Sequence, residues 1–241
     1  MKFSTIFLTI LASIPLAAQD PPSPLVYIYR EQIKPGKIAR YVQIEEAAAT
    51  FCAKAKCPNP YLAISSFTGP NEAWWINGFD TPDTMEKVMH DYAANQEITQ
   101  ELNSVAEQKA DLAFPASILL ARFRPDMSFY TTPIPPRYFS ISIVRVLPGH
   151  VAAFANARIR SKAALERAGR PQWVYQVTSG TDDVTFLIMT PARTMQEIQT
   201  TPDDASDAIV SSETRLYAVS PSMSMPAQSW IDADPEFWKR P

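Results

Sequence analysis

The segment IKPGKIARYV, residues 33–42, recurs as VLPGHVAAFA at residues 146–155. In both segments a Pro-Gly pair follows a run rich in β-branched and aromatic residues. Apolar residues at helical spacing come after the pair, which is the pattern of a strand, a turn and a helix. The same order of elements is therefore expected twice in the chain.

Other segments match in the same order along the chain, as an internal duplication requires. They are Pro60 and Gly69 with Pro171 and Gly180, TPDTMEK (81–87) with TPARTMQE (190–197), and PDMS (125–128) with PSMS (221–224). The spacing between matched positions falls from 113 to 96 residues, so the first copy holds an additional segment before Pro125. That segment is free of Gly and has the composition of a helix.

Each copy is expected to form a strand, a helix, a hairpin of two strands, a second helix and a closing strand. The second helices are expected at Thr81-Pro82 and Thr190-Pro191, with Thr as the N-cap and Pro in the first turn. This βαββαβ order is that of a ferredoxin-like unit, which has both helices on one face of its sheet. We therefore predict an α+β fold of two tandem ferredoxin-like repeats, packed sheet to sheet as a pseudo-two-fold α/β barrel.

The predicted boundaries follow from these matches. They are a signal peptide at 1–18, a first repeat at 24–127, a Pro-rich linker at 128–135, a second repeat at 136–225 and a C-terminal tail at 226–241. The tail contains Trp230, Phe237 and Trp238 and is too apolar to be free, so it is expected to pack on the barrel or on a second molecule.

Composition narrows the function classes. The 241 residues include 22 Lys+Arg and 25 Asp+Glu, a net charge of -3, and 46% are hydrophobic, as in an ordinary globular protein. Nucleic acid is not an expected partner, because phosphate binding needs a basic surface. No metal site is predicted, and the chain lacks a Gly-rich phosphate loop, a His-Glu-x-x-His pair and a Gly-x-Ser-x-Gly elbow.

The N-terminal residues MKFSTIFLTILASIPLAAQD have the pattern of a secretory signal: a Lys, a short apolar stretch and small residues before the cleavage point. We expect an exported protein, periplasmic or secreted, with no membrane association after cleavage. Cys52 and Cys57 lie close together in CAKAKC. In an oxidising compartment they are compatible with a local disulfide, and the alternative is two buried thiols.

The turn Lys34–Lys37 and the stretch GFDTPDTMEKVMHDY (78–92) resemble the dimeric α/β-barrel superfamily, in particular its antibiotic-biosynthesis-monooxygenase-like domains. The resemblance covers residues 24–127 and 136–225. The superfamily includes cofactor-free oxygenases, haem-degrading enzymes and members of unknown role. The resemblance thus implies a barrel that binds a small molecule, and it specifies fold better than chemistry.

In the haem-degrading members a helix His binds iron, a strand-end Trp presses on the porphyrin and a first-strand Asn donates a hydrogen bond. His90 stands one residue beyond the His position, Phe79 occupies the Trp position and Tyr29 roughly the Asn position. Haem degradation by that route is therefore not expected. No cofactor is predicted, and haem binding through an imidazole stays open.

His90 and Tyr29 are the predicted catalytic groups, and His90 could equally be a helix-surface histidine. Tyr27, Tyr29, Ser140 and Ser142 are predicted to line a polar barrel interior, because the serines alternate with apolar residues and the tyrosines occupy the equivalent positions. The alternative for the tyrosines is strand packing.

The strand AWWINGF supplies three further predicted ligand-binding residues: Trp74, Asn77 and Phe79. Trp74 and its neighbour Trp75 must point to opposite faces of the strand. Trp74 is expected to face the interior, as a stacking platform or as ordinary core. Asn77 could orient a ligand or complete a hydrogen bond within the sheet.

Three functions are compatible with these observations. The first is an exported protein that binds a small apolar or aromatic molecule, as a cofactor-independent monooxygenase-like enzyme or without turnover. The second is a non-catalytic ligand-binding or interaction module that can self-associate. The third is a haem-binding protein.

Overall fold

The computed structural model describes residues 22–130, 135–198 and 207–239. The predicted signal peptide and residues 131–134 of the predicted linker lie outside this range. In the described residues eight strands form one closed antiparallel barrel in the order β1-β3-β2-β8-β5-β7-β6-β4. The strands are β1 (Leu25–Ile33), β2 (Tyr61–Ser66), β3 (Glu72–Phe79), β4 (Ala113–Phe123), β5 (Tyr138–Val146), β6 (Trp173–Ser179), β7 (Val184–Ala192) and β8 (Ile209–Val219).

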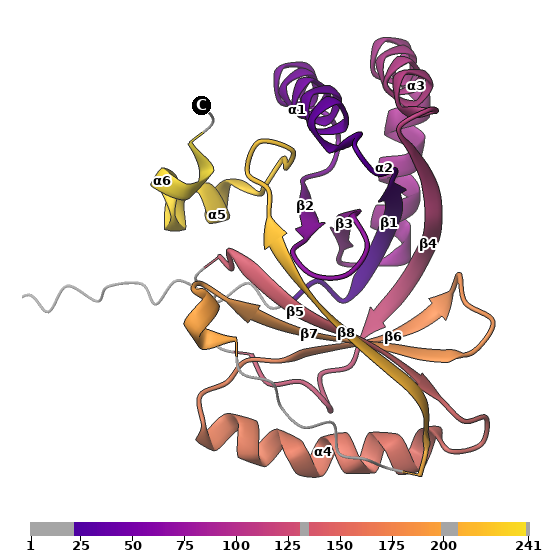
Figure 1. Ribbon diagram of the computed structural model, residues 1–241, viewed down its shortest axis with the longest axis vertical. Helices are drawn as coiled ribbons and strands as arrows, with labels where there is room; N and C mark the ends of the chain where they lie inside the picture. The colour runs from indigo at the N-terminus through magenta and orange to yellow at the C-terminus, as the bar shows by residue number, and fades with distance from the viewer. Residues whose placement is uncertain (1–21, 131–134, 199–206, 240–241) are drawn as a thin grey trace, which may run out of the picture.

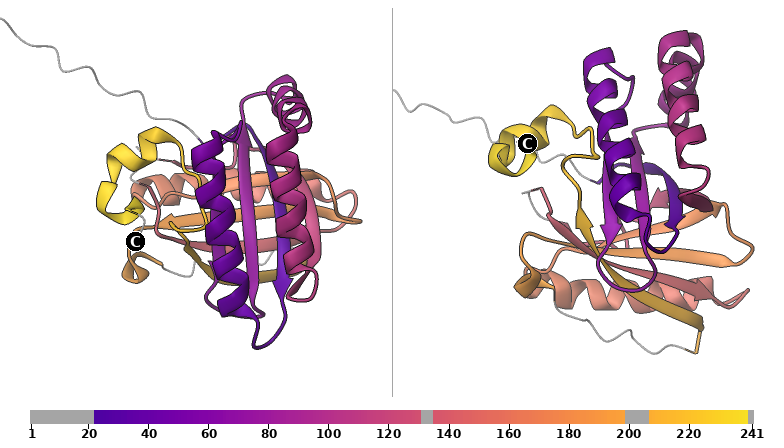
Figure 2. Two further views of the ribbon diagram at one scale, coloured as in Figure 1. Left: turned by 90° about the horizontal axis from the view of Figure 1, so that it is seen from above. Right: turned by 45° about the horizontal axis from the view of Figure 1, so that its top comes forward.

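The helices lie outside the barrel (Figure 1). They are α1 (Ile38–Ala55), α2 (Pro82–Ala94), α3 (Gln96–Lys109), α4 (Val151–Arg167), α5 (Gln228–Ala233) and α6 (Pro235–Trp238), with a 3-10 turn η1 (Met195–Glu197). Figure 2 shows α1 and α3 side by side over the strands of the first half, and α4 along the opposite side of the molecule. The predicted α+β barrel is confirmed.

Two strand pairs join the halves. Within the first half the spatial order is β4-β1-β3-β2, and within the second it is β8-β5-β7-β6. β2 pairs with β8, where Ile64 faces Val219, and β4 pairs with β6, where Leu120 faces Ser179. These seams are short, three residue pairs between β2 and β8 and four between β4 and β6, so each of the eight described strands has a neighbour on both sides over at least part of its length.

The turns and caps form where their residue types predict. Gly36 and Gly149 have φ of 75° and 81°, a left-handed conformation that favours Gly after Pro in each strand-to-helix turn. Thr81 is the N-cap of α2, and its side chain accepts a hydrogen bond from the backbone N–H of Thr84. The additional segment of the first copy forms α3.

The predicted helix start at Thr190-Pro191 is wrong, because both residues belong to β7. β7 continues along β5, with Pro191 opposite Phe139. Its pairing with β6 ends at Met189, so the missing N–H of Pro191 leaves no bond unmade on that side. Within the described residues that follow, the chain forms only η1 before β8.

The predicted polar interior is also wrong. Val26 and Ile28 of β1 and Phe139 and Ile141 of β5 belong to one buried apolar cluster with Trp74. Tyr29 packs instead in the cluster under α1 and α3, and the neighbours of Ser142 on its face pack under α4. The interior of an eight-stranded barrel is only wide enough to be filled by side chains, so the larger apolar set occupies it.

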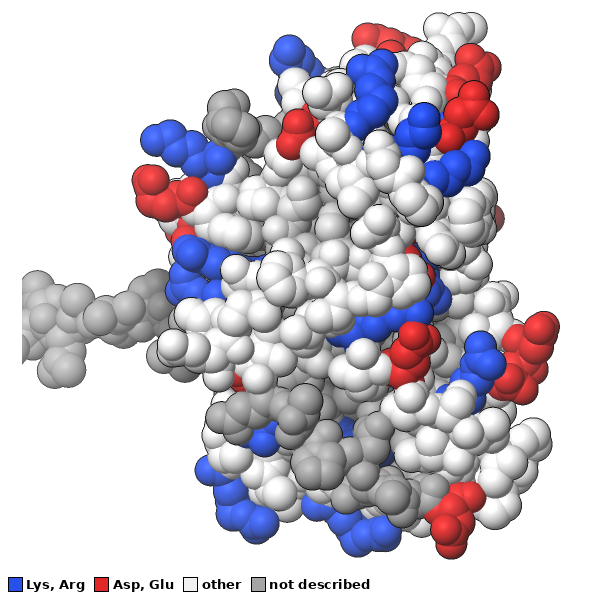
Figure 3. Space-filling model, viewed as in Figure 1, with Lys and Arg blue, Asp and Glu red and all other residues white. Residues whose placement is uncertain are grey.

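Charged side chains are spread over the surface. Figure 3 shows Lys, Arg, Asp and Glu at the top, bottom and both sides of the face seen in Figure 1, and blue beside red to the right of its centre. No helix among the described residues is both long and apolar enough to cross a membrane.

Candidate functional site

A cavity of about 440 Å³ opens at one end of the barrel, which we call the mouth cavity. It lies where β1, β2, β5 and β6 begin and where β3 and β7 end. Its apolar wall includes Val26, Leu62, Ile76 and Met189. The volume is within the range of about 300–1,000 Å³ that is usual for small-molecule sites.

Aromatic side chains make up much of the rest of the wall. They are Tyr61, Phe139, Trp173, Tyr175 and Trp230. The rings of Phe139 and Trp173 meet edge to face, with centroids 5.6 Å apart. The Tyr175 hydroxyl donates a hydrogen bond to the backbone oxygen of Ser23 at 3.3 Å, and burial raises the pKa of Tyr175, which keeps the phenol neutral. The wall suits a flat apolar ligand.

The C-terminal segment covers this end of the barrel. Ala227 and Trp230 line the mouth cavity, and Trp238 is buried in the cluster that fills the barrel. In Figure 1 this segment, which contains α5 and α6, lies at the left beside the ends of β5 and β7.

Asp234 fastens that segment to the barrel. Its buried carboxylate accepts hydrogen bonds from the Arg137 guanidinium, the shortest at 2.9 Å, and one from Arg193 at 2.8 Å. The Arg137 guanidinium also lies 4.9 Å from the centre of the Phe237 ring. A carboxylate held by two arginines fixes the cover of the cavity in one position.

A charged cluster lies towards the other end of the barrel, where β1 ends and β3 begins. Glu72 accepts hydrogen bonds from Arg30 at 3.1 Å and from the Trp74 indole at 3.0 Å, and it lies 2.9 Å from Arg215. Burial alone would raise the pKa of Glu72, but the Trp74 hydrogen bond and the charges of Arg30 and Arg215 outweigh it and lower the pKa. Glu72 is thus a paired anion inside the barrel.

A second buried charged cluster joins β1, α1 and α3. The Lys109 ammonium lies 2.9 Å from Glu31 and 2.5 Å from Glu45. Tyr41 and Tyr29 donate their hydroxyls to Glu31, at 2.5 and 3.1 Å. Burial raises the pKa of Glu45; burial would lower the pKa of Lys109, but the charges of Glu45 and Glu31 outweigh it and raise it.

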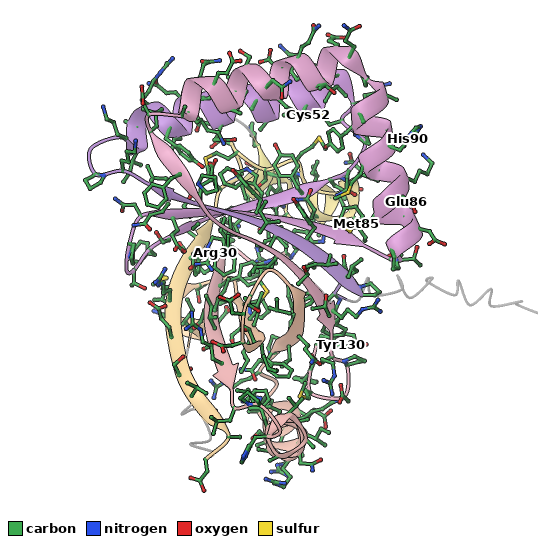
Figure 4. The ribbon with its side chains drawn as sticks, turned by 90° about the vertical axis from the view of Figure 1, so that its right-hand side faces the viewer. Arg30, Cys52, Met85, Glu86, His90 and Tyr130 are labelled. Carbon is green, nitrogen blue, oxygen red and sulfur yellow. A yellow bond between two sulfur atoms is a disulfide. The ribbon has the colours of Figure 1, made fainter. Side chains whose placement is uncertain are left out.

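The predicted catalytic pair is not assembled. His90 is exposed on α2, and Figure 4 shows it at the margin of the molecule, away from the strands that carry Arg30. Tyr29 lies on the helix-facing side of β1, 5.9 Å from Trp75 between ring centres, where burial raises its pKa. Neither lines the mouth cavity. The short, degenerate motif around His90 does not determine which face of α2 the His90 side chain occupies.

Of the predicted ligand-binding residues, Trp74 faces the barrel interior as expected and is fully buried. Its ring is already in contact with other side chains: the Tyr217 ring lies 5.0 Å away between centres, and the Arg30 guanidinium lies 4.5 Å from the ring centre. Trp75 packs under the helices, also as expected. Trp74 is therefore interior core rather than cavity wall.

The remaining predicted ligand-binding residues lie outside the barrel interior. Side chains alternate along β3, so Asn77 and Phe79 lie on the same side as Trp75, which faces the helices, and on the opposite side from Ile76. The Asn77 side chain accepts a hydrogen bond from the Asn59 amide at 3.4 Å and donates one to the Tyr27 carbonyl at 3.5 Å, which agrees with the alternative of a hydrogen bond within the sheet. Tyr27, Ser140 and Ser142 likewise do not line the cavity, and Ser142 hydrogen-bonds to Thr214 at 2.7 Å.

Cys52 and Cys57 form a disulfide, with Cα atoms 4.9 Å apart. The bond closes the turn at the end of α1, where Lys56 has a φ of 56° and Cys57 donates its N–H to the Cys52 carbonyl. Both cysteines are buried with Ile98 of α3. The disulfide thus ties the end of α1 to the loop before β2, and neither cysteine lines the mouth cavity.

Sequence reasoning missed most of the cavity wall and both charged clusters. The wall combines strand starts with Pro22 and Trp230, which are far apart in sequence and carry no motif. A signal for the clusters was present, since Arg30, Glu31 and Glu72 are charges inside otherwise apolar strands. Such charges must be paired when the strand is buried.

The described residues do not fit a haem held by imidazole. His90 is exposed on α2, His150 is exposed at the start of α4, and neither lines the cavity. No group of three or more His, Cys, Asp or Glu side chains in the described part of the chain could hold a metal ion.

No family model matches the chain, and no curated protein matches it by sequence. Solved structures do match. A putative monooxygenase from Fusobacterium nucleatum has a TM-score of 0.54 at 12% identity, over 82% of this chain and 93% of that one. One from Lactobacillus acidophilus has 0.51 at 11%, over 82% and 94%.

A putative chlorite dismutase has a TM-score of 0.51 at 10% identity, over 83% of this chain and 96% of that one. At these identities the likeness concerns the fold, and it extends over nearly the whole of each matched chain. This chain therefore shares its fold with these monooxygenase-like and chlorite-dismutase-like structures.

Proposed function

We propose that the protein binds a small, largely apolar or aromatic molecule in the mouth cavity. The observation that carries the proposal is the cavity itself, a hollow of about 440 Å³ with an aromatic wall at an end of an otherwise filled barrel. The charged cluster around Glu72 occupies the barrel towards its other end, so the ligand enters at the mouth. The covering segment held by Asp234 would then shield the bound ligand from water.

The proposal is one of binding rather than of a particular reaction. A cofactor-independent oxygenase would need a base beside its substrate. The ionisable side chains of the wall are Asp80, Tyr61 and Tyr175, and the Tyr175 hydroxyl is already engaged by Ser23. The fold shared with putative monooxygenases supports an oxygenase only as a second candidate, with Asp80 as its base.

We also propose that the barrel consists of two tandem ferredoxin-like repeats. The order β4-β1-β3-β2 recurs as β8-β5-β7-β6, which supports this. Export from the cell is proposed from the N-terminal sequence and agrees with a structural disulfide. N-terminal sequencing of the protein from fractionated cells tests it, and an intact Met1 in the cytoplasmic fraction would contradict it.

The binding proposal is tested with N-phenyl-1-naphthylamine, a neutral dye that fluoresces in apolar surroundings. We expect saturable binding to the purified protein, with quenching of Trp emission because Trp173 and Trp230 line the cavity. Absence of saturable binding by this dye and by naphthalene itself would overturn the proposal.

A matched pair of variants locates the site. Ala227→Phe adds a ring to the cavity wall, and Ala152→Phe makes the same change at an exposed position on α4. We expect the first to weaken dye binding at least about tenfold, because the added ring fills the ligand's space. The second should leave binding as it was. Equal binding by both would place the dye elsewhere.

A further inference from the structure

The charge of the mouth cavity wall is one-sided. Among the described residues that line it, Asp80 carries the only charged side chain. Asp80 is exposed at the rim, directly after β3 and before the N-cap Thr81. Within the described part of the chain no hydrogen bond or ion pair engages its carboxylate. A ligand at the rim would therefore meet a free negative charge.

The backbone of the wall is rich in acceptors. Four lining residues are prolines, which have a carbonyl oxygen and no N–H, and two of these carbonyls, those of Pro24 and Pro60, already accept hydrogen bonds from Phe123 and Asn59. They are Pro22, Pro24, Pro60 and Pro226. The nearby guanidinium groups of Arg137 and Arg193 are both bound to Asp234. The described lining residues thus offer an anion no cationic partner.

The aromatic rings add to this preference. Their π faces carry negative partial charge and attract ammonium and guanidinium groups by about 0.5–2 kcal/mol each. The chain uses the same contact elsewhere, with Arg30 lying 4.5 Å from the Trp74 ring. A cavity with five rings, carbonyl acceptors and one carboxylate is complementary to a cation with an apolar body.

We propose that the mouth cavity selects organic cations, in which an aromatic or aliphatic body enters the barrel and an ammonium group lies between the aromatic wall and Asp80. This inference rests on the proposed binding function and names the class of its ligand.

Three naphthalene derivatives with the same body test it by displacing N-phenyl-1-naphthylamine. They carry CH₂N(CH₃)₃⁺, its neutral isostere CH₂C(CH₃)₃, or the anion CH₂SO₃⁻. We expect the cation to displace the dye at a concentration about tenfold lower than the sulfonate does, from one ring contact and one exposed ion pair. Asp80→Asn should weaken binding of the cation about fivefold relative to binding of the neutral isostere, because an exposed ion pair contributes up to about 1 kcal/mol, which is about that factor.

Asp83→Asn is the matched control, since Asp83 is an exposed carboxylate in the first turn of α2 that does not line the cavity. Asp83→Asn should change neither the cation-to-sulfonate nor the cation-to-isostere ratio of displacing concentrations. If the dye binds but the sulfonate competes as well as the cation does, the cation preference is wrong and the binding function stands. If neither the dye nor naphthalene binds, both fail. The comparison of cation and anion on the unaltered protein needs no variant to fold.

Discussion

Replacing Lys109 by Met removes one positive charge from between two buried carboxylates while keeping most of the side chain's length. Glu31 and Glu45 have side chains only 7% exposed, and Lys109 lies within 2.9 Å of both. The charge and hydrogen bond of Lys109 are the influences that lower the pKa of Glu45 against burial, so the stabilisation of this carboxylate depends on Lys109. Removing one partner of a buried ion pair costs about 3–5 kcal/mol.

At pH 8 we therefore expect Lys109→Met to lower the free energy of unfolding by about 3–5 kcal/mol. For a chain of this length that corresponds to a fall in Tm of about 6–20 °C. The matched control is Lys87→Met, since Lys87 is 72% exposed in an ion pair with Asp91 on α2. An exposed pair contributes about 0–1 kcal/mol, so the control should be nearly neutral.

The loss should shrink at lower pH. Burial already holds the pKa of Glu45 above its unfolded value, so its ionisation costs stability as pH rises through that interval. Without Lys109 that pKa rises further, so protonation of Glu45 as pH falls relieves part of the unpaired charge and the loss of stability is smaller at the lower pH. In the unaltered protein the raised pKa of Lys109 acts in the same direction at higher pH: its contribution to stability is complete below the unfolded pKa and is lost as pH rises through the folded one.

Urea unfolding followed by Trp fluorescence at pH 5 and pH 8 measures both effects. Glu45→Gln combined with Lys109→Met should recover more than half of the loss at pH 8, because Glu31 keeps its hydrogen bonds from Tyr41 and Tyr29. If Lys109→Met costs no more than Lys87→Met, or costs the same at both pH values, the account of this cluster is refuted.

Three further predictions concern the C-terminal cover of the cavity, the disulfide and one turn. Asp234→Ala should lower the free energy of unfolding by about 2 kcal/mol and make the C-terminal segment sensitive to limited proteolysis. Asp232→Ala, which loses only an exposed hydrogen bond from Gln228, should do neither. If the segment stays equally resistant to proteolysis in Asp234→Ala, Asp234 does not fasten it. Cys52→Ser with Cys57→Ser should lower stability by about 2 kcal/mol at most, and the unreduced native chain should show no free thiol when unfolded in a thiol assay; a titratable thiol would count against the bond. Gly180→Ala should lower the free energy of unfolding clearly more than Gly149→Ala does. Both residues have a left-handed backbone, which costs a non-Gly residue about 1–2 kcal/mol, but a Cβ at Gly180 would also overlap the Ile118 carbonyl, while one at Gly149 meets open space. Similar unfolding midpoints for the two variants would refute this.

Elements with a local cause could be predicted from the sequence. The Pro-Gly turns, the Thr81 cap, the hairpin at Gly69 and the opposed faces of Trp74 and Trp75 each follow from a few adjacent residues. The helix expected at Thr190-Pro191 failed because the length of β7 depends on its partners β5 and β6, which are distant in sequence.

The candidate site was predicted poorly, and the reason is physical. Alternation shows that Ser140 and Phe139 lie on opposite faces of β5, but it does not show which face is inside. The closed barrel decides this, because its narrow interior must be filled, and the apolar set fills it. The predicted polar lining was thereby turned outwards, together with Tyr29.

The sequence by itself determined the helix that follows each Pro-Gly turn, the strands that flank it and the nearness of Cys52 to Cys57, because backbone preference and short loops act over a few residues. Tertiary structure alone decided the mouth cavity, the pairing of Glu72 with Arg215 and the fastening of Asp234 to Arg137. Each of these joins segments separated by about 100 residues or more, and such contacts depend on closure of the barrel rather than on any local pattern.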